Sequence, residues 1–160
     1  LTTKLFGQDG AALYGRMMAL NGIVVVLGNP IIVSKLRRFH PLANITASGL
    51  LYAVGFSLFA FAVSPIAFLA LTVIFTTGEI INATNEHFYV ANNTPISHRS
   101  RFSAILPIIM GTGHAVAPII GGSIIEAHSM NLLWISTGLG ALIGSLGIFI
   151  LYLTEKKPRN

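Results

Sequence analysis

Five long apolar stretches, separated by short polar connections, organise the chain. They cover residues 13–33, 42–63, 66–90, 102–125 and 132–153. Each is close to the roughly 20 residues that a helix needs to cross the hydrocarbon core of a bilayer. The pattern predicts an all-α fold, a polytopic bundle of five membrane-spanning helices that makes up a single domain, residues 1–160. Because the connections are short, neighbouring helices are expected to run antiparallel.

The composition favours lipid as the solvent for most side chains. The chain is 53% hydrophobic and only 9% charged, with a mean hydropathy of +0.74, whereas soluble domains are about 25% charged. So few charges cannot cover a globular surface. The formal net charge of +5 does not indicate a nucleic-acid partner, because the basic residues form short clusters beside the apolar stretches rather than one basic face.

The basic residues gather in alternate connections. They are Lys35, Arg37 and Arg38 in the first connection, Arg99 and Arg101 in the third, and Lys156, Lys157 and Arg159 in the tail. If every stretch crosses the bilayer, these clusters share one side, which the positive-inside rule assigns to the cytoplasm. We therefore expect an integral protein of the cell membrane, the inner membrane of a bacterium, with a cytoplasmic C-terminus.

Polar side chains are unevenly distributed among the five stretches. The first, third and fourth contain Arg16, Asn21, Asn29, Glu79, Asn82, Asn85, Glu86 and His114. Ionisable groups in lipid cost at least a few kcal/mol each, so they usually face a bundle interior or a wet cavity. We expect the first, third and fourth stretches to line such a cavity, and the second and fifth to face lipid.

Three segments resemble those of a known family. Residues 75–79, Phe-Thr-Thr-Gly-Glu, are similar to a Gly-Glu pair midway along helix ten in bacterial multidrug-type members of the major facilitator superfamily. Residues 90–101, with Arg99, Ser100 and Arg101, resemble the following loop. Gly113, Ala117, Pro118, Gly121 and Gly122 resemble the glycine and proline pattern of helix five in antiporters of the family, here in its repeat counterpart, helix eleven. Together they resemble the C-terminal half of the family, helices eight to twelve.

One loop departs from the family pattern. Between helices eight and nine the family often repeats Gly-x-x-x-Asp-Arg-x-Gly-Arg. The corresponding positions here hold Pro30, Ser34, Lys35, Arg37 and Arg38. The aspartate and both glycines are missing, so the gating role that the family assigns to this loop does not carry over residue by residue.

The resemblance implies a secondary active transporter, a proton-coupled antiporter that exports a small organic solute or drug and uses no cofactor. Its partners would be the substrate, protons and the lipid bilayer. Such transporters rock two halves about a midplane site, so the chain is expected to be a fragment that works with an N-terminal half and a seventh helix. The alternative is a small oligomerising channel subunit or scaffold. An enzyme is not expected, because no nucleophile elbow, phosphate loop or metal-ligand motif is present.

The third stretch carries the main candidates for chemistry. At 100° per residue, one third of the helix circumference holds Gly78, Glu79, Asn82, Asn85, Glu86 and Tyr89, with His87 on the other side. This arc is either a cavity-facing stripe or a polar seam bonded to a neighbouring helix. At 1.5 Å per residue, Glu79 lies about 20 Å into the stretch and Glu86 about 30 Å, near the cytoplasmic boundary.

Depth separates the expected roles of the two acids. At the depth of Glu79 a protonated carboxyl group costs less than a charged one, which suits proton coupling or binding of a cation. A hydrogen-bonded packing role remains the alternative. Glu86 can be solvated at the interface, where it is a candidate partner for the arginines of the cytoplasmic loops.

The other candidate site residues are Asn82, His114, Asn21 and Asn29. Counting from Leu13 places Asn29 nearer to Glu79 in depth than Asn21. Counting from the cytoplasmic end of the fourth stretch places His114 about 20 Å in, which separates it from Glu79 by about 10 Å in depth. His114 either lines the cavity or is a hydrogen-bonded packing residue. Kinks and close packing are expected at Pro107, Gly113, Pro118, Gly121 and Gly122, and Gly140 with Gly144 forms a Gly-x-x-x-Gly pair typical of internal packing.

We predict that residues 35–40, residues 98–101 and the tail share one side of the membrane, because all three carry the basic clusters. The chain has no cysteine, so single cysteines introduced in each segment can be labelled from either side with an impermeant thiol reagent. Labelling of the three segments from opposite sides would end the five-span topology.

Overall fold

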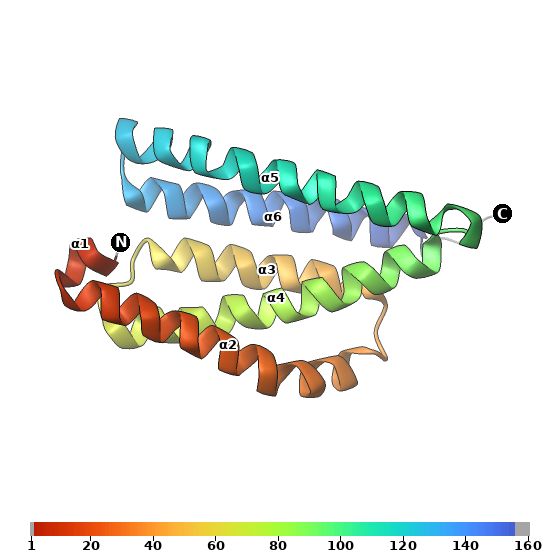
Figure 1. Cartoon of the computed structure of the whole chain (residues 1–160), viewed down its shortest axis with the longest axis horizontal. Coiled ribbons are helices and arrows are strands. Elements are labelled where there is room, and N and C mark those ends of the chain that lie inside the picture. Colours follow the sequence, from red (N-terminus) through yellow and green to blue (C-terminus); the bar gives the residue numbers. More distant parts are fainter. Residues whose placement is uncertain (1, 156–160) are drawn as a thin grey trace.

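The computed structural model describes residues 2–155, which form six α-helices and one short 3₁₀ helix. In chain order they are α1 (Thr2–Phe6), α2 (Asp9–Leu36), α3 (Pro41–Phe59), α4 (Pro65–Asn93), η1 (Ile96–His98), α5 (Arg99–Ala127) and α6 (Met130–Glu155). The helices α2 to α6 are long and apolar enough to cross a membrane, and they alternate in direction (Figure 1). The predicted all-α fold with five spans is confirmed. The basic residues of the tail lie outside the described residues.

Two of the connections end in a helix cap followed by proline. The Nδ1 atom of His40 accepts a hydrogen bond from the backbone N–H of Leu42 (3.3 Å), and Ser64 Oγ accepts one from Ala67 (3.2 Å). Pro41 and Pro65 then occupy the first turn of α3 and α4, where their missing N–H costs nothing. Both helix starts are thus determined by local sequence.

The second span is shorter than its apolar pattern predicted, since α3 ends at Phe59 and not at residue 63. Residues 60–63 form the turn into α4, with Ala60 and Phe61 donating to the carbonyls of Ser57 and Leu58. Ser64 must be extended because it precedes proline, and it is, with φ −120° and ψ 148°. The turn looks apolar in sequence because it is partly buried; Ala62 is 7% exposed.

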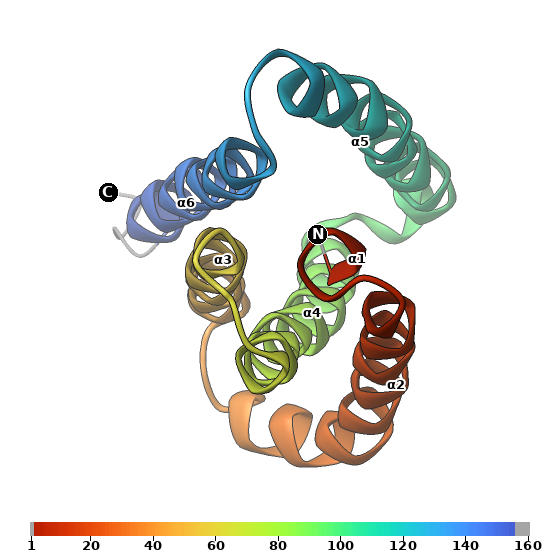
Figure 2. The same cartoon turned by 90° about the vertical axis from the view of Figure 1, so that its left-hand side faces the viewer.

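The second span, α3, lies between α4 and α6, and α2 packs on the far side of α4 (Figure 2). The expectation that this span faces lipid is therefore wrong for its polar side. Asn44 and Ser48 are buried, at 4% and 1% exposure. Asn44 donates to groups of α2 and α4. Ser48 Oγ donates to the carbonyl of Ile45 in its own helix and to Asn82 of α4. Such bonds are how polar side chains are accommodated within a membrane.

Small residues bring α3 and α6 into close contact. Ser145 Oγ donates to the backbone carbonyl of Thr46 at 2.8 Å. A Cβ atom on Gly49 would lie 2.7 Å from that of Ser145, and one on Gly138 would lie 2.8 Å from the carbonyl oxygen of Ala53. Such distances leave no room for a side chain, so the two backbones approach as closely as in other small-residue helix pairs.

The aromatic core lies at the opposite end of the bundle from the basic loops. The ring of Phe59 is 5.1 Å from Trp134, 5.6 Å from Phe68 and 6.2 Å from Phe75, measured between centroids. Leu13 of α2 joins the same buried cluster. These side chains link α2, α3, α4 and α6 at one end of the bundle, and the contacts between small residues of α3 and α6 continue toward the other end.

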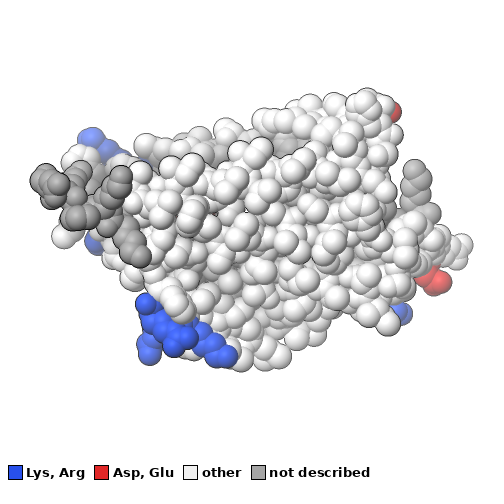
Figure 3. All heavy atoms as spheres, turned by 180° about the vertical axis from the view of Figure 1, so that it is seen from behind, with Lys and Arg blue, Asp and Glu red and all other residues white. Residues whose placement is uncertain are grey.

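Most Lys and Arg side chains of the described residues lie at the two ends of the helices. Figure 3 shows Lys and Arg gathered at the ends and a broad uncharged band between them on the face in view. Lys35, Arg37, Arg38, Arg99 and Arg101 all belong to the end at which α2 and α4 finish and α3 and α5 begin. An uncharged band of this kind is what a bilayer core requires.

The fourth span, α5, runs without a break through Pro107 and Pro118 and packs against α6. A Cβ atom added to Gly121 would contact Leu133 of α6 at 3.4 Å. Gly113 and Gly122 have no neighbour within 4 Å among the described residues. The close packing expected at these glycines is therefore seen at Gly121 alone of the three.

The Gly-x-x-x-Gly pair was the wrong choice of packing residues on α6. Gly140 and Gly144 have open space where a Cβ atom would stand, whereas Gly138 is in contact with α3. Replacing Gly138 by Ala should lower the free energy of unfolding by about 1–3 kcal/mol, because the added methyl group overlaps the α3 backbone. Gly140→Ala is the matched control, two residues away, and should be neutral or slightly stabilising. Thermal unfolding in detergent measures both; equal effects would contradict this packing.

Candidate functional site

A membrane-depth contact between α2 and α4 contains the central candidate, Glu79. The Nδ2 atom of Asn21 donates to Glu79 Oε2 at 3.1 Å and to Thr76 Oγ1 at 2.8 Å. An amide nitrogen carries two N–H donors, so Asn21 uses both on α4. Glu79 forms no ion pair with another described residue. The carboxyl group is therefore held by a neutral donor.

The depth order of the two candidate asparagines was predicted wrongly. The count from Leu13 placed Asn29 nearer to Glu79, but it is Asn21 that bonds to the carboxyl group. The helix begins four residues earlier, at Asp9. At 1.5 Å per residue, Asn21 is then about 18 Å from the start of α2 and Glu79 about 21 Å from the start of α4, at the same end of the bundle.

A cavity of about 370 Å³ lies beside this contact. Its walls are formed by Val25, Asn29, Glu79, Ile80, Ala83, Thr84 and His87. The predicted site residues Glu79 and Asn29 thus do meet, across a shared space and from different helices. Glu79 and His87 are both exposed, so the cavity presents a carboxyl and an imidazole group on one face of α4.

His87 is a candidate that the sequence analysis missed. The polar arc was drawn through Asn82 and Asn85, which placed His87 on the other side of the helix. The observed face follows the spacing i, i+4, i+8 through Glu79, Ala83 and His87, which is one continuous stripe of an α-helix. That spacing is present in the sequence, but Ala83 is not polar, so a search for polar side chains alone does not reveal the stripe.

Asn82 and Asn85 lie on the side of α4 that faces α3. Asn85 Oδ1 accepts a hydrogen bond from Asn44 Nδ2 at 2.8 Å, and Asn82 Oδ1 accepts one from Ser48 Oγ at 3.4 Å. For this part of the arc the polar-seam interpretation is correct. Asn82 does not line the α2–α4 cavity. The predicted polar stripe therefore divides into two faces of α4, one bonded to α3 and one bonded to α2.

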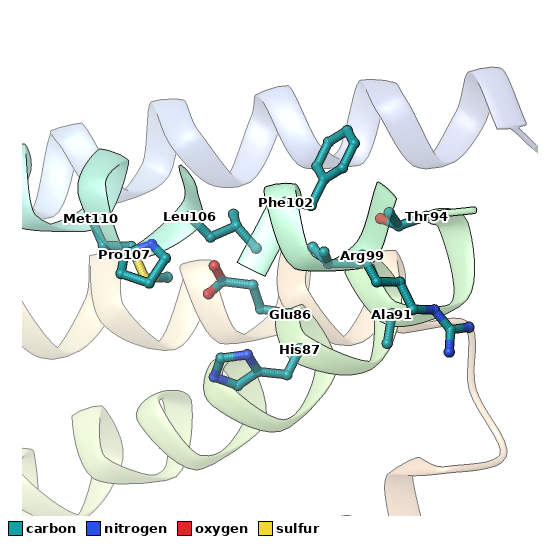
Figure 4. A pocket seen from close by; sticks show the side chains of 10 residues that line it. Glu86, His87, Ala91, Thr94, Arg99, Phe102, Leu106, Pro107 and Met110 are labelled. Carbon is teal, nitrogen blue, oxygen red and sulfur yellow. The ribbon is translucent and has the colours of Figure 1, made fainter. Parts of the chain in front are cut away.

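Glu86 lies in a second cavity, of about 330 Å³, between α4 and α5. It accepts a hydrogen bond from Asn82 Nδ2 at 3.2 Å. Figure 4 shows its carboxyl group directed toward Leu106 of α5, while the guanidinium group of Arg99 points away from it, although both residues line the cavity. Glu79 and Glu86 therefore line different cavities, on different sides of α4.

His114 is not brought to Glu79. It lies on α5, is exposed, and its Nδ1 atom is 2.9 Å from the backbone carbonyl of Met110 in its own helix. No hydrogen bond joins it to another described helix. Among the predicted site residues, the structure thus groups Asn21, Asn29 and Glu79, and leaves His114 apart.

Comparison with known proteins identifies a family that this chain matches. The family model described as Major Facilitator Superfamily matches residues 4–160. Two proteins of Bacillus subtilis (strain 168) are similar: the uncharacterized MFS-type transporter YqjV, 24% identical over 74% of this chain and 28% of its own length, and the uncharacterized MFS-type transporter YttB, 24% identical over 88% of this chain and 36% of its own. The chain thus spans about a third of the length of these relatives. No solved structure matches.

The cavity should be open to water-soluble reagents in the intact protein. Ala83→Cys lies in the cavity wall, whereas Ile81→Cys, two residues away on α4, replaces a side chain that is 7% exposed. We expect a small hydrophilic thiol reagent to modify Ala83→Cys much faster than Ile81→Cys, since thiol reagents need access to the sulfur. Equal protection of the two cysteines would show that water does not reach this face.

Proposed function

The chain belongs to the major facilitator superfamily, and we propose that it forms part of a secondary transporter that couples proton movement to the export of a small organic solute. The observation that supports this proposal is the carboxyl group of Glu79. It lies midway along a membrane-spanning helix, accepts a hydrogen bond from Asn21 and borders a cavity. An ionisable group in that position is costly for the fold and is usually retained for function.

Proton coupling needs a group that binds a proton in one state and releases it in another. Asn21 is a neutral donor, so it stabilises the charged form of Glu79 less than a cation would. It bonds to Oε2, and the other carboxyl oxygen, Oε1, has no hydrogen-bond partner among the described residues. A cationic substrate in the cavity would supply the missing charge and displace the proton. His87 and Asn29, in the same cavity wall, would then bind polar parts of the substrate or relay the proton.

The working transporter is proposed to include an N-terminal half and a further helix beside α5. Transport in transporters of this kind requires two repeats that move about a shared site, and the chain spans about a third of the length of the relatives it matches. The exposed side of α5, where Gly113 and Gly122 have open space, supports a contact with such a helix. The basic end of the bundle, with the C-terminus, would face the cytoplasm of a bacterial cell.

A small oligomerising channel subunit or scaffold is the other class considered. It would bring copies of the chain together through glycine-rich helix faces, of which the open Gly140 and Gly144 face of α6 is the best placed. A channel subunit or scaffold of this kind does not require a carboxyl group at membrane depth. Transport that depends on Glu79 therefore separates the two functions.

Glu79→Gln should abolish transport driven by a proton gradient while the protein still inserts and folds, because the amide keeps the shape and the contact with Asn21 but cannot release a proton. Glu86→Gln is the matched control, on the same helix and of the same chemistry, and should retain gradient-driven transport. The measurement is efflux of a fluorescent organic cation from vesicles that contain the intact transporter. If Glu79→Gln transports at the normal rate and with the normal pH dependence, this carboxyl group is only a packing group.

A further inference from the structure

The last turn of α2 and the connection to α3 carry three cations that form no ion pair with another described residue. Lys35, Arg37 and Arg38 are all exposed, and among the described residues none of them forms a side-chain hydrogen bond or an ion pair. The guanidinium group of Arg38 lies over the ring of Phe39, 5.0 Å from its centroid. Figure 3 shows blue patches of Lys and Arg at this end of the bundle.

The one carboxylate at the end of α6 does not neutralise this cluster. Glu155 accepts a hydrogen bond from Tyr89 and lies 3.9 Å from His40 Nε2. Asp9 and Glu126 belong to the opposite end of the bundle. The positive charge of the connection is thus available to an anion from outside the described chain, and cations beside a bilayer surface attract anionic headgroups.

An apolar pocket opens beside the same cations. It has a volume of about 230 Å³ between the end of α2, the start of α3 and the last turns of α4, and its walls are formed by Val33, Leu36, Arg37, Phe39, Pro41, Thr84, Asn85 and Phe88. Phe39 and Phe88 are 50% and 58% exposed. Arg37 is part of the wall, so the positive charge and the apolar surface belong to one site.

We propose that this site binds an anionic phospholipid. The phosphate group lies on Lys35, Arg37 and Arg38, and an acyl chain covers the pocket between Val33, Leu36 and Phe88. The site is at the end of the membrane-spanning part of α2, the level at which a headgroup and the first part of its chain are found together. Guanidinium groups bind phosphate bidentately. The apolar wall favours a ligand with an acyl chain over a free phosphate ion, which has no apolar part.

The test uses the intact transporter, purified in detergent, and the binding of phosphatidylglycerol measured by native mass spectrometry against phosphatidylcholine with the same acyl chains. We expect phosphatidylglycerol to bind more tightly. Arg37→Gln with Arg38→Gln should weaken its binding by roughly thirtyfold, the factor that two basic side chains contribute beside an anionic group. Arg37→Lys with Arg38→Lys keeps the charge and should retain most of the binding, which separates loss of charge from misfolding.

Two controls separate this site from general attraction to the basic end. Arg99→Gln with Arg101→Gln removes the same charge from the same end of the bundle, away from the pocket, and should leave the affinity within about twofold of the wild type, since distant charges are screened. Phe88→Ala should weaken lipid binding, whereas Phe102→Ala, at a ring of similar exposure on α5, should not.

Three results would overturn the proposal. The first is equal binding of phosphatidylglycerol and phosphatidylcholine by the wild type. The second is an equal loss in the two arginine pairs, which would mean that the whole basic end attracts lipid without a site. The third is complete displacement of the lipid by millimolar glycerol phosphate, which would mean that the cations bind a free phosphate and the pocket contributes nothing.

Discussion

The side-chain amide of Asn44 joins three helices at the end of the bundle that carries the basic loops. Asn44 is only 4% exposed, and its Nδ2 atom donates to the carbonyl of Leu36 at 3.0 Å and to Asn85 Oδ1 at 2.8 Å. The last carbonyls of a helix have no partner within it, so this contact also caps α2. In lipid an unsatisfied amide is costly. The requirement to satisfy this one group therefore holds α2, α3 and α4 in a fixed arrangement.

This contact also determines which side chains of α4 remain available for function. With Asn85 turned to α3, Glu79 lies about 120° and His87 about 160° around the helix axis from it. Both are therefore directed away from α3, toward α2 and the open side of the bundle. The polar residues of α4 thus divide into two faces: those bonded to α3 fix the rotation of the helix, and those on the far side border the α2–α4 cavity.

Much of the fold could be predicted, because the five apolar runs and the basic clusters between them are local signals. The predictions that were wrong concerned which face of a helix is buried, and this depends on contacts between helices that a single sequence does not specify. The polar face of α3 becomes buried only because Asn85 and Ser145 lie opposite it. Gly138, and not Gly140, packs against α3 because Gly138 is the one that lies next to the backbone of Ala53. Glu79, Asn21 and Asn29 were all candidates from the sequence, but the pairing of Glu79 with Asn21 required the observed start of α2. His87 required the face of α4 on which α2 lies.

The central claim is that Glu79 carries the coupled proton, and it is tested most directly by measuring proton movement during substrate exchange. Vesicles containing the intact transporter and a trapped pH-sensitive dye are given a gradient of an organic cation, with no proton gradient imposed. Wild-type protein should move protons against the substrate flow, and Glu79→Gln should exchange substrate across the membrane while moving no protons. Proton movement by Glu79→Gln equal to that of the wild type would contradict the account.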